Sequence, residues 1–352
     1  MTQKFRIFRS TVALPALAIG LIAAQSAQAD GHLDSLDLNV VGSWSTSNIY
    51  PDYEVPFWTE RLPEASGGQI NATIQAFDEV GLAGGDVYEL VEQGVYDVGA
   101  TVIGYVAGED PRFEGHDLPA VADPEQSRAI VDAYRDVLAE AFDETYDQQL
   151  LGVIPFTSQI VYCNTAIEGL EDMEGLRIRG SGRFTMDFIE AIGGDAQDVS
   201  FDEVPVALER GVIDCGITGA LSGFLAGWTE VSTHYYPLPA GGWDHVGITM
   251  RNDIWEGLSE DTQEFLMEQF AELEDWVWGD APGQTDVGIA CNTGGDCAYG
   301  DPGDLTLVEV DDDDLAFAVD MVEAEVLPQW FERCGEECEA RWLDTVGAVY
   351  GQ

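Results

Sequence analysis

The chain has 352 residues, of which 66 are Asp or Glu and 14 are Lys or Arg, so its formal net charge is −52. Such an acidic chain lacks the basic face that binding to nucleic acid or anionic lipid requires, and we expect neither. Hydrophobic residues make up 45% of the sequence and nine tryptophans are present, which favours a packed core over an acidic disordered chain. We interpret the charge as adaptation to a saline exterior, where salt screens the self-repulsion.

Residues 1–29 are typical of a secretory signal peptide. Lys4, Arg6 and Arg9 precede an apolar stretch that is too short to span a membrane, and small residues at Ala27 and Ala29 end it. Cleavage after Ala29 predicts a periplasmic protein without direct membrane insertion, the alternative being an uncleaved anchor. Without these three cations, 11 arginines and no lysine stand against 66 acids, a net charge of about −55.

All six cysteines follow the predicted signal peptide, and an even number in an exported chain favours disulfides. The glycine-containing segment from Cys291 to Cys297 could close on itself, and the pair Cys334 and Cys338 could do the same. Cys163 and Cys215 would then remain, although the sequence alone does not choose among the possible pairings. A metal site is the alternative. No histidine lies nearby, so we expect no metal and no other cofactor.

From Leu36 onward, short apolar runs rich in β-branched residues alternate with helical patterns. This alternation predicts an α/β fold with a largely parallel sheet covered by helices, and its repetition in the second half predicts two lobes that face each other across a cleft. The predicted strands are 36–44, 70–78, 96–103, 150–157, 160–164, 176–180, 212–218, 243–250 and 304–310. The predicted helices are 55–65, 85–95, 125–146, 185–194, 202–211 and 259–278, with further helices after the acidic run 311–314.

Two helix starts are predicted from capping chemistry. Ser259 precedes a clear amphipathic pattern with acids in its first turn, which is typical of an N-cap. The four acids Asp311–Asp314 suggest either a calcium loop or a helix N-terminus. The spacing and glycine of an EF-hand are missing, so we favour the helix N-terminus.

Three of the few arginines lie close together in the segment GLRIRGSGR. In a strand, Arg177 and Arg179 point to the same face, and a guanidinium fork matches a carboxylate in bidentate geometry. The alternative is that Arg177, Arg179 and Arg183 all pair with acids of the protein itself. For Arg179, beside Gly180 and Gly182, which permit close approach of a ligand, the binding role is favoured.

The same region resembles the signature of the solute-binding proteins of tripartite ATP-independent periplasmic (TRAP) transporters, the DctP family. The matching segments are GLRIRG, AIGG, DEVPVALERGVIDC and WTEVSTHYYPLP, in the family's order. The first half is similar as well, in FWTERLPEASGGQINATI and DVYELVEQGVYDVGATVIGYVAGEDPRFEGHDLP. The resemblance covers nearly the whole chain after residue 29.

The resemblance implies a monomeric periplasmic receptor with crossover strands between its lobes and a long bracing helix. Such a receptor delivers its solute to the membrane subunits of a TRAP permease, which an ion gradient drives. We expect one lobe from 30–156 with 245–284 and the other from 157–244 with 285–352. The alternatives are a receptor of an ATP-driven (ABC) importer and a sensory domain. An enzyme is disfavoured, because the four histidines form no recognisable catalytic motif.

Arg179 matches the family's arginine that pairs with the solute carboxylate. Gln159 and Thr218 stand where a sugar-acid-binding branch has a second arginine and an asparagine, so we expect a small organic acid with one anionic group, or a zwitterion. The loops that should face the cleft carry aromatic residues, which either line it or pack in the core. The expected ligand-binding residues are Arg179, Gln159, Thr218, Trp243, Trp44, Tyr105 and Arg177, and Asp244 could receive an amine or a hydroxyl of the solute.

Overall fold

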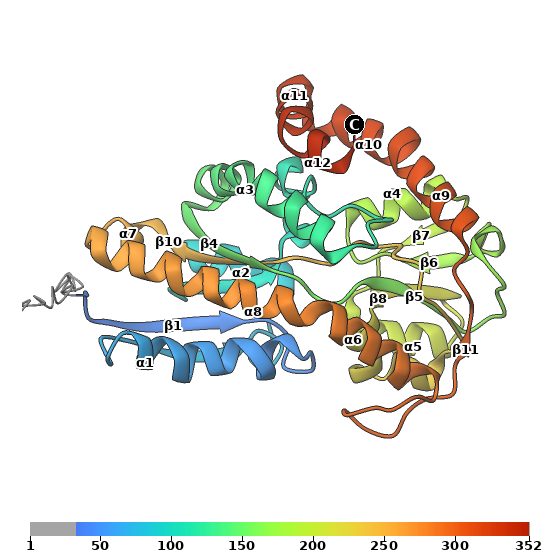
Figure 1. Ribbon diagram of the computed structural model, residues 1–352, viewed down its shortest axis with the longest axis horizontal. Coiled ribbons are helices and arrows are strands. Elements are labelled where there is room, and N and C mark those ends of the chain that lie inside the picture. Colours follow the sequence, from blue (N-terminus) through green and yellow to red (C-terminus); the bar gives the residue numbers. More distant parts are fainter. Residues whose placement is uncertain (1–32, 352) are drawn as a thin grey trace, which may run out of the picture. The chain divides into compact units, whose positions relative to one another are not determined.

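The computed structural model describes residues 33–351, which belong to one compact unit. The predicted signal peptide, residues 1–29, lies outside the described residues. Two β-sheets, each flanked by helices, make up the fold (Figure 1). None of the helices between residues 33 and 351 is both long enough and apolar enough to cross a membrane.

The first sheet has the strand order β2-β1-β3-β10-β4. Its first three strands are parallel, whereas β10 runs antiparallel to both of its neighbours. All five residues of β3 are buried, as expected for a strand covered on both faces. The strands are β1 (Leu36–Gly42), β2 (Ile70–Ala76), β3 (Val98–Val102), β4 (Gln148–Ile154) and β10 (Val246–Arg251).

The second sheet has the strand order β11-β9-β5-β8-β6-β7. Within it, β6 is parallel to β7 and β8, while β5 is antiparallel to β8 and β9. The strands are β5 (Gln159–Cys163), β6 (Arg177–Arg179), β7 (Asp195–Gln197), β8 (Cys215–Gly219), β9 (His234–Tyr236) and β11 (Thr306–Leu307).

The expectation of largely parallel sheets is therefore wrong in part, because both sheets are mixed. Two short crossings take the chain from one sheet to the other, between β4 and β5 and between β9 and β10, and the long segment 252–305 takes it back to the second sheet before β11. Each strand that arrives by such a crossing, β5 or β10, runs against its new neighbours. The strands of the first sheet come from 36–154 and 246–251, and those of the second from 159–236 and 306–307. The predicted lobe boundaries lie near these crossings, and their exact positions stay a prediction.

Helices surround both sheets (Figure 1). Ser259 and Asp311 accept hydrogen bonds from the backbone N–H groups of Thr262 and Asp314, so both predicted caps are confirmed. The helices are α1 (Leu62–Ala65), α2 (Val87–Glu92), α3 (Pro124–Tyr146), α4 (Arg183–Ala191), α5 (Val204–Glu209), α6 (Ala220–Leu225), α7 (Asn252–Trp255), α8 (Glu260–Thr293), α9 (Asp312–Met321), α10 (Leu327–Cys334), α11 (Glu336–Trp342) and α12 (Ala348–Tyr350). Two helical turns, η1 (Tyr50–Glu54) and η2 (Phe57–Arg61), precede α1.

Helix α8 is 34 residues long and braces both sheets (Figure 1). It packs on β4 of the first sheet and on α6 beside the second. The sequence predicts its end near Trp278, because glycine and proline follow, yet the helix continues through Pro282 to Thr293. Packing against α6 overrides the weak local propensity of this segment.

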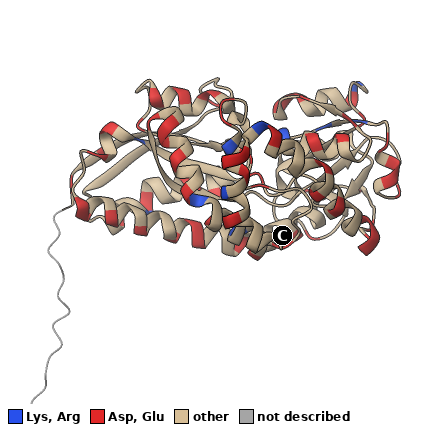
Figure 2. Cartoon of the chain, turned by 90° about the horizontal axis from the view of Figure 1, so that it is seen from above, with Lys and Arg blue, Asp and Glu red and all other residues tan. Residues whose placement is uncertain are grey.

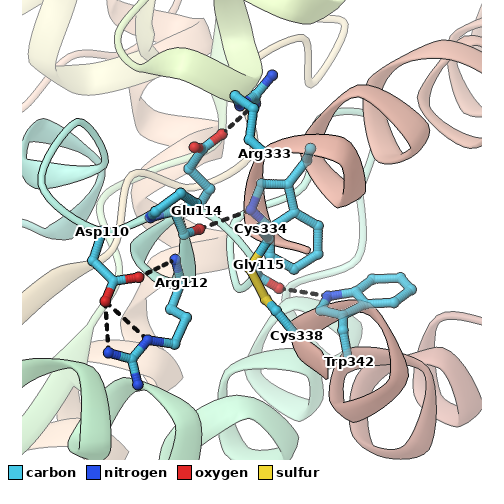
Figure 3. The surroundings of a disulfide bond; sticks show 10 residues. Asp110, Arg112, Glu114, Gly115, Arg333, Cys334, Cys338 and Trp342 are labelled. Atoms are coloured by element: carbon cyan, nitrogen blue, oxygen red, sulfur yellow. Dashed lines mark hydrogen bonds and ion pairs between the residues drawn. A yellow bond between two sulfur atoms is a disulfide. The ribbon is translucent and has the colours of Figure 1, made fainter. Parts of the chain in front are cut away.

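The C-terminal helices contact the loop 110–117 of the first half of the fold (Figure 3) and α4 of the second. From α10, the Trp330 indole Nε1 donates to the carbonyl of Pro111 at 2.7 Å, and from α11, the Trp342 Nε1 donates to the carbonyl of Gly115 at 2.8 Å. Arg333 bridges Glu114 and Asp187, at 2.6 Å from each carboxylate. These contacts fasten the loop 110–117 to α4 and to the C-terminal helices.

Three disulfides join the cysteines in the pairing that the simplest sequence reading suggests: Cys163–Cys215, Cys291–Cys297 and Cys334–Cys338. The first links directly opposed residues of β5 and β8, and the third joins α10 to α11 (Figure 3). Among residues 33–351 no cysteine is free and no cluster of His, Cys, Asp or Glu is arranged to hold a metal ion.

Candidate solute-binding site

A cavity lies where the two sheets meet. It is reached by the carboxyl ends of β1, β3, β6 and β8, which is where open α/β sheets bind ligands. Both sheets and the crossings between them contribute side chains to its wall. The lining residues are Trp44, Ser47, Val102, Tyr105, Phe156, Gln159, Arg179, Phe201, Thr218, Ser222 and Asp244.

Arg179, the last residue of β6, brings positive charge to this cavity. Its side chain is 3% exposed, and no other arginine between residues 33 and 351 is buried. The guanidinium donates from Nε to the carbonyl of Val199 at 3.0 Å and from Nη1 to the carbonyl of Ile217 at 2.8 Å. Eight arginines of this part of the chain form ion pairs with carboxylates, and Arg179 is not one of them. Backbone carbonyls therefore orient its charge without neutralising it.

Several neutral polar groups share the cavity with Arg179. Gln159 begins β5 and donates from Nε2 to the carbonyl of Thr157 at 3.0 Å, while its Oε1 is buried without a protein partner. The hydroxyl of Ser222, on α6, is also buried without a protein partner. Because an unpaired buried polar group is costly, these atoms are suited to bonding a polar solute.

Aromatic rings form the apolar wall. Trp44 makes edge-to-face contacts with Tyr105, Phe156 and Phe201, at ring-centroid distances of 5.6, 6.1 and 5.7 Å. Phe201 belongs to the helical turn η7 (Phe201–Glu203) beside the second sheet, so rings from both halves of the fold meet here. Burial raises the pKa of the Tyr105 hydroxyl, and the neighbouring charge of Arg179 opposes that rise. Such a wall accommodates a flat or apolar solute body.

Asp244 is the carboxylate of the cavity. It lies in the connection from β9 to β10 and adopts a left-handed backbone conformation with φ of 46°. Burial and the nearby charge of Asp117 raise the pKa of its side chain, whereas the charge of Arg179 and a hydrogen bond from Ser181 lower it, and the resulting pKa is about 7. From the sequence, Asp244 is predicted only as a possible partner for an amine or a hydroxyl of the solute.

The structure brings five of the seven expected residues to the cavity: Arg179, Gln159, Thr218, Trp44 and Tyr105. It places Arg177 and Trp243 elsewhere. Arg177 is partly exposed and its Nη2 lies 2.7 Å from Asp214, an acid of the protein itself. Trp243 is buried, and its indole Nε1 donates to the carbonyl of Val121 at 2.9 Å, so it packs in the core.

Sequence reasoning missed several lining residues, namely Ser47, Val102, Phe156, Phe201 and Ser222. Phe156 lies near the end of the predicted strand 150–157, and an aromatic residue at such a position is a signal that could identify it. Phe201 and Ser222 sit at helix starts in the second half of the chain, where no local pattern distinguishes a cavity residue from a core residue.

Comparison with known proteins identifies the family. The sequence model of the bacterial extracellular solute-binding proteins of family 7, DctP, matches residues 43–283. No curated protein sequence matches the chain. Among solved structures, DctP7 of Bordetella pertussis, an extracytoplasmic solute receptor binding pyroglutamic acid, is 20% identical with a TM-score of 0.74, over 89% of this chain and 100% of that one.

Two further solved structures share the fold. A TRAP solute-binding protein from a marine metagenome, described as specific for pyroglutamate, is 18% identical with a TM-score of 0.76, over 91% of this chain and 100% of that one. A TRAP periplasmic solute-binding protein from Desulfovibrio salexigens with bound orotic acid is 15% identical with a TM-score of 0.77, over 89% and 99%. The predicted two-lobed α/β binding-protein fold is thus confirmed, and the chain belongs to the DctP family of TRAP-transporter solute-binding proteins, which are extracytoplasmic receptors and not enzymes.

Proposed function

We propose that this receptor binds a small solute with a single carboxylate and a flat body, and that it delivers this solute in the periplasm to the membrane subunits of a TRAP permease. The observation that carries the proposal is Arg179, a buried guanidinium that lines the cavity and forms no ion pair with any carboxylate of residues 33–351. A buried cation of this kind is complementary to an anionic group brought by a ligand.

The charges around the cavity indicate how many anionic groups the solute carries. Among the lining residues Arg179 is the only cation, and Asp244 contributes an opposing charge. A dicarboxylate would therefore bring more negative charge than the site balances. The solutes named for the similar structures, pyroglutamic acid and orotic acid, each carry one carboxylate on a small ring, which supports the same class here.

Binding is expected to close the cleft. Solute contacts on Arg179 and Phe201 come from the second sheet and its flanking turn, and contacts on Trp44 come from the first, so only a closed form satisfies both sets. A solute that binds the closed form better shifts the population toward it. We also propose that the receptor works as a monomer, as the resemblance to the family implies.

The proposal is tested by identifying the solute and titrating it. Mass spectrometry of the small molecules released on denaturation should find a monocarboxylate. Calorimetry at high salt should then show that pyroglutamate, orotate or the released solute binds, and that the matched carboxamide of the same compound binds at least about a hundredfold more weakly. Equal binding of acid and carboxamide, or release of a solute without an anionic group, would contradict the proposal.

A further inference from the structure

We propose that Asp244 is a specificity-determining residue: among small carboxylates it selects those that carry an N–H donor or an ammonium group, and Asp117 positions it. This inference rests on the proposed function, since it takes Arg179 to hold the carboxylate of the solute. It adds a second group of the cavity that recognises the solute, at a distinct position from the arginine that binds the carboxylate.

The backbone around Asp244 is held by both crossings between the sheets. The backbone N–H of Phe156 donates to the carbonyl of Trp243 at 3.0 Å, and that of Gln159 donates to the carbonyl of Gly242 at 2.8 Å. The left-handed φ of 46° at Asp244 is uncommon for a residue other than glycine. The turn therefore directs the Asp244 carboxylate to the cavity in a conformation that the surrounding structure imposes.

The Asp117 carboxylate holds the backbone of this turn in place by accepting its N–H groups. Its carboxylate Oδ1 accepts the backbone N–H of Trp243 at 2.8 Å, and the N–H groups of Asp244 and His245 also point to it. The preceding Gly242 has a φ of 75°, and a Cβ added there would lie 2.3 Å from Asp117 Oδ1. Successive backbone N–H groups around one carboxylate form a compact anion nest, so the position of Asp244 depends on Asp117.

No cation between residues 33 and 351 forms an ion pair with the Asp244 carboxylate. His245 and His116 lie behind the turn with their Nδ1 atoms 2.9 Å apart, and burial lowers the pKa of both imidazoles, so they are neutral at physiological pH. Arg179 lines the same cavity, but no ion pair within 4.0 Å joins it to Asp244 among residues 33–351. The cavity therefore presents a positive and a negative pole that are separate.

A solute with a carboxylate and an N–H group can bond both poles at once. A solute without a donor leaves the Asp244 carboxyl desolvated, with the side chain of Ser181 as its hydrogen-bond partner from the protein. Sites built to bond a donor of the ligand reject such a solute most strongly. The rings of Trp44, Tyr105 and Phe156 border the same space, and aromatic faces also favour a positively polarised nitrogen. These features together favour nitrogen-bearing carboxylates over plain organic acids.

The test uses matched pairs of probes in which a ring oxygen replaces the nitrogen, so that one member has an N–H or ammonium group and the other has none. Pyroglutamate is paired with the corresponding lactone acid, in which a ring oxygen replaces the N–H, and proline is paired with tetrahydrofuran-2-carboxylate. In wild-type protein the N–H member should bind at least about tenfold more tightly by calorimetry. Asp244→Gly, which suits the left-handed φ, should reduce this ratio to within about threefold by weakening only the N–H member. Asp244→Asn, which also tolerates that φ, checks that loss of charge suffices.

Two further variants make the result interpretable. Asp198→Asn removes an exposed carboxylate outside the cavity and should leave the ratio unchanged. Asp117→Asn should lower the ratio while the lactone acid keeps its affinity, whereas general damage to the fold would weaken both members equally.

The outcomes separate this inference from the proposed function. Three outcomes would overturn the inference and leave the proposed function standing. The carboxylates could bind without preference for the N–H member, or the preference could persist in Asp244→Gly. The third outcome is a retained solute without any N–H or ammonium group. Failure of all carboxylates to bind would overturn the proposed function together with it.

Discussion

At the scale of single residues, Glu54 shows how burial couples protonation to stability. It lies on η1 with no exposed surface, and its Oε2 accepts hydrogen bonds from the backbone N–H and the hydroxyl of Ser43, at 2.9 and 2.8 Å. Burial raises the pKa of this carboxyl to about 7, although the bonds from Ser43 lower it. The folded state therefore binds the proton more tightly than the unfolded chain, whose pKa is about 4.5.

The sign of the pH dependence follows from this difference. The stabilisation is complete below about pH 4.5 and is lost as the pH rises through about 7. Glu54→Gln should remove this component, so that the variant gains roughly 2–4 kcal/mol relative to wild type between pH 5 and pH 8. Urea unfolding of both proteins at the two pH values, at constant high salt, measures the gain. Parallel pH profiles would show that Glu54 titrates normally.

The residues of the cavity differ in how well the sequence predicts them. Arg179 could be predicted, because strand alternation and two adjacent glycines identify an arginine at a strand end. The cavity position of Asp244 could not be, since it depends on a bond to Asp117, which lies 126 residues earlier than Trp243 in the chain. Arg177 follows the same strand alternation as Arg179, yet Asp214 pairs with it, and no local pattern reports a partner that distant.

At the scale of elements, α8 is held to α6 by a close backbone approach at Gly288. A Cβ built there would lie 2.5 Å from the carbonyl carbon of Ala220. Gly288→Ala should therefore push the helices apart and destabilise the protein by about 1–3 kcal/mol. Gly279→Ala on the same helix meets open space and should stabilise by about 0.5–1 kcal/mol through helix propensity. Thermal and urea unfolding measure both, and equal effects would contradict the packing described for α6 and α8.

Most elements could be predicted from periodicity and capping, and the failures have physical causes. Strands β7 and β9 contain three residues each, which is too short for a period-two pattern to stand out. The continuation of α8 beyond Trp278 depends on its contact with α6, which overrides glycine and proline in its sequence. The antiparallel insertion of β5 and β10 depends on the crossings between the sheets, which are tertiary features.

At the scale of the whole molecule, the charge distribution predicts dependence on salt. Acidic residues are spread over helices and loops, and basic residues are few (Figure 2). Since salt shortens the Debye length from about 10 Å at 0.1 M to about 3 Å at 1 M, it should relieve the mutual repulsion of the carboxylates. The melting temperature should rise steeply with NaCl at low concentration and level off near molar salt. A melting temperature that does not change over this range would contradict the interpretation of the charge as adaptation to a saline exterior.

The most direct test of the role of Arg179 is calorimetric titration of the solute that the protein retains, with Arg179→Ala and Arg177→Ala measured side by side. Both variants remove one guanidinium from the same strand, but only Arg179 lines the cavity. Arg179→Ala should weaken binding by about 2–4 kcal/mol, and Arg177→Ala should change it by less than about 0.5 kcal/mol. Unchanged affinity in Arg179→Ala, or an equal loss in both variants, would contradict the assignment of Arg179 as the partner of the solute carboxylate.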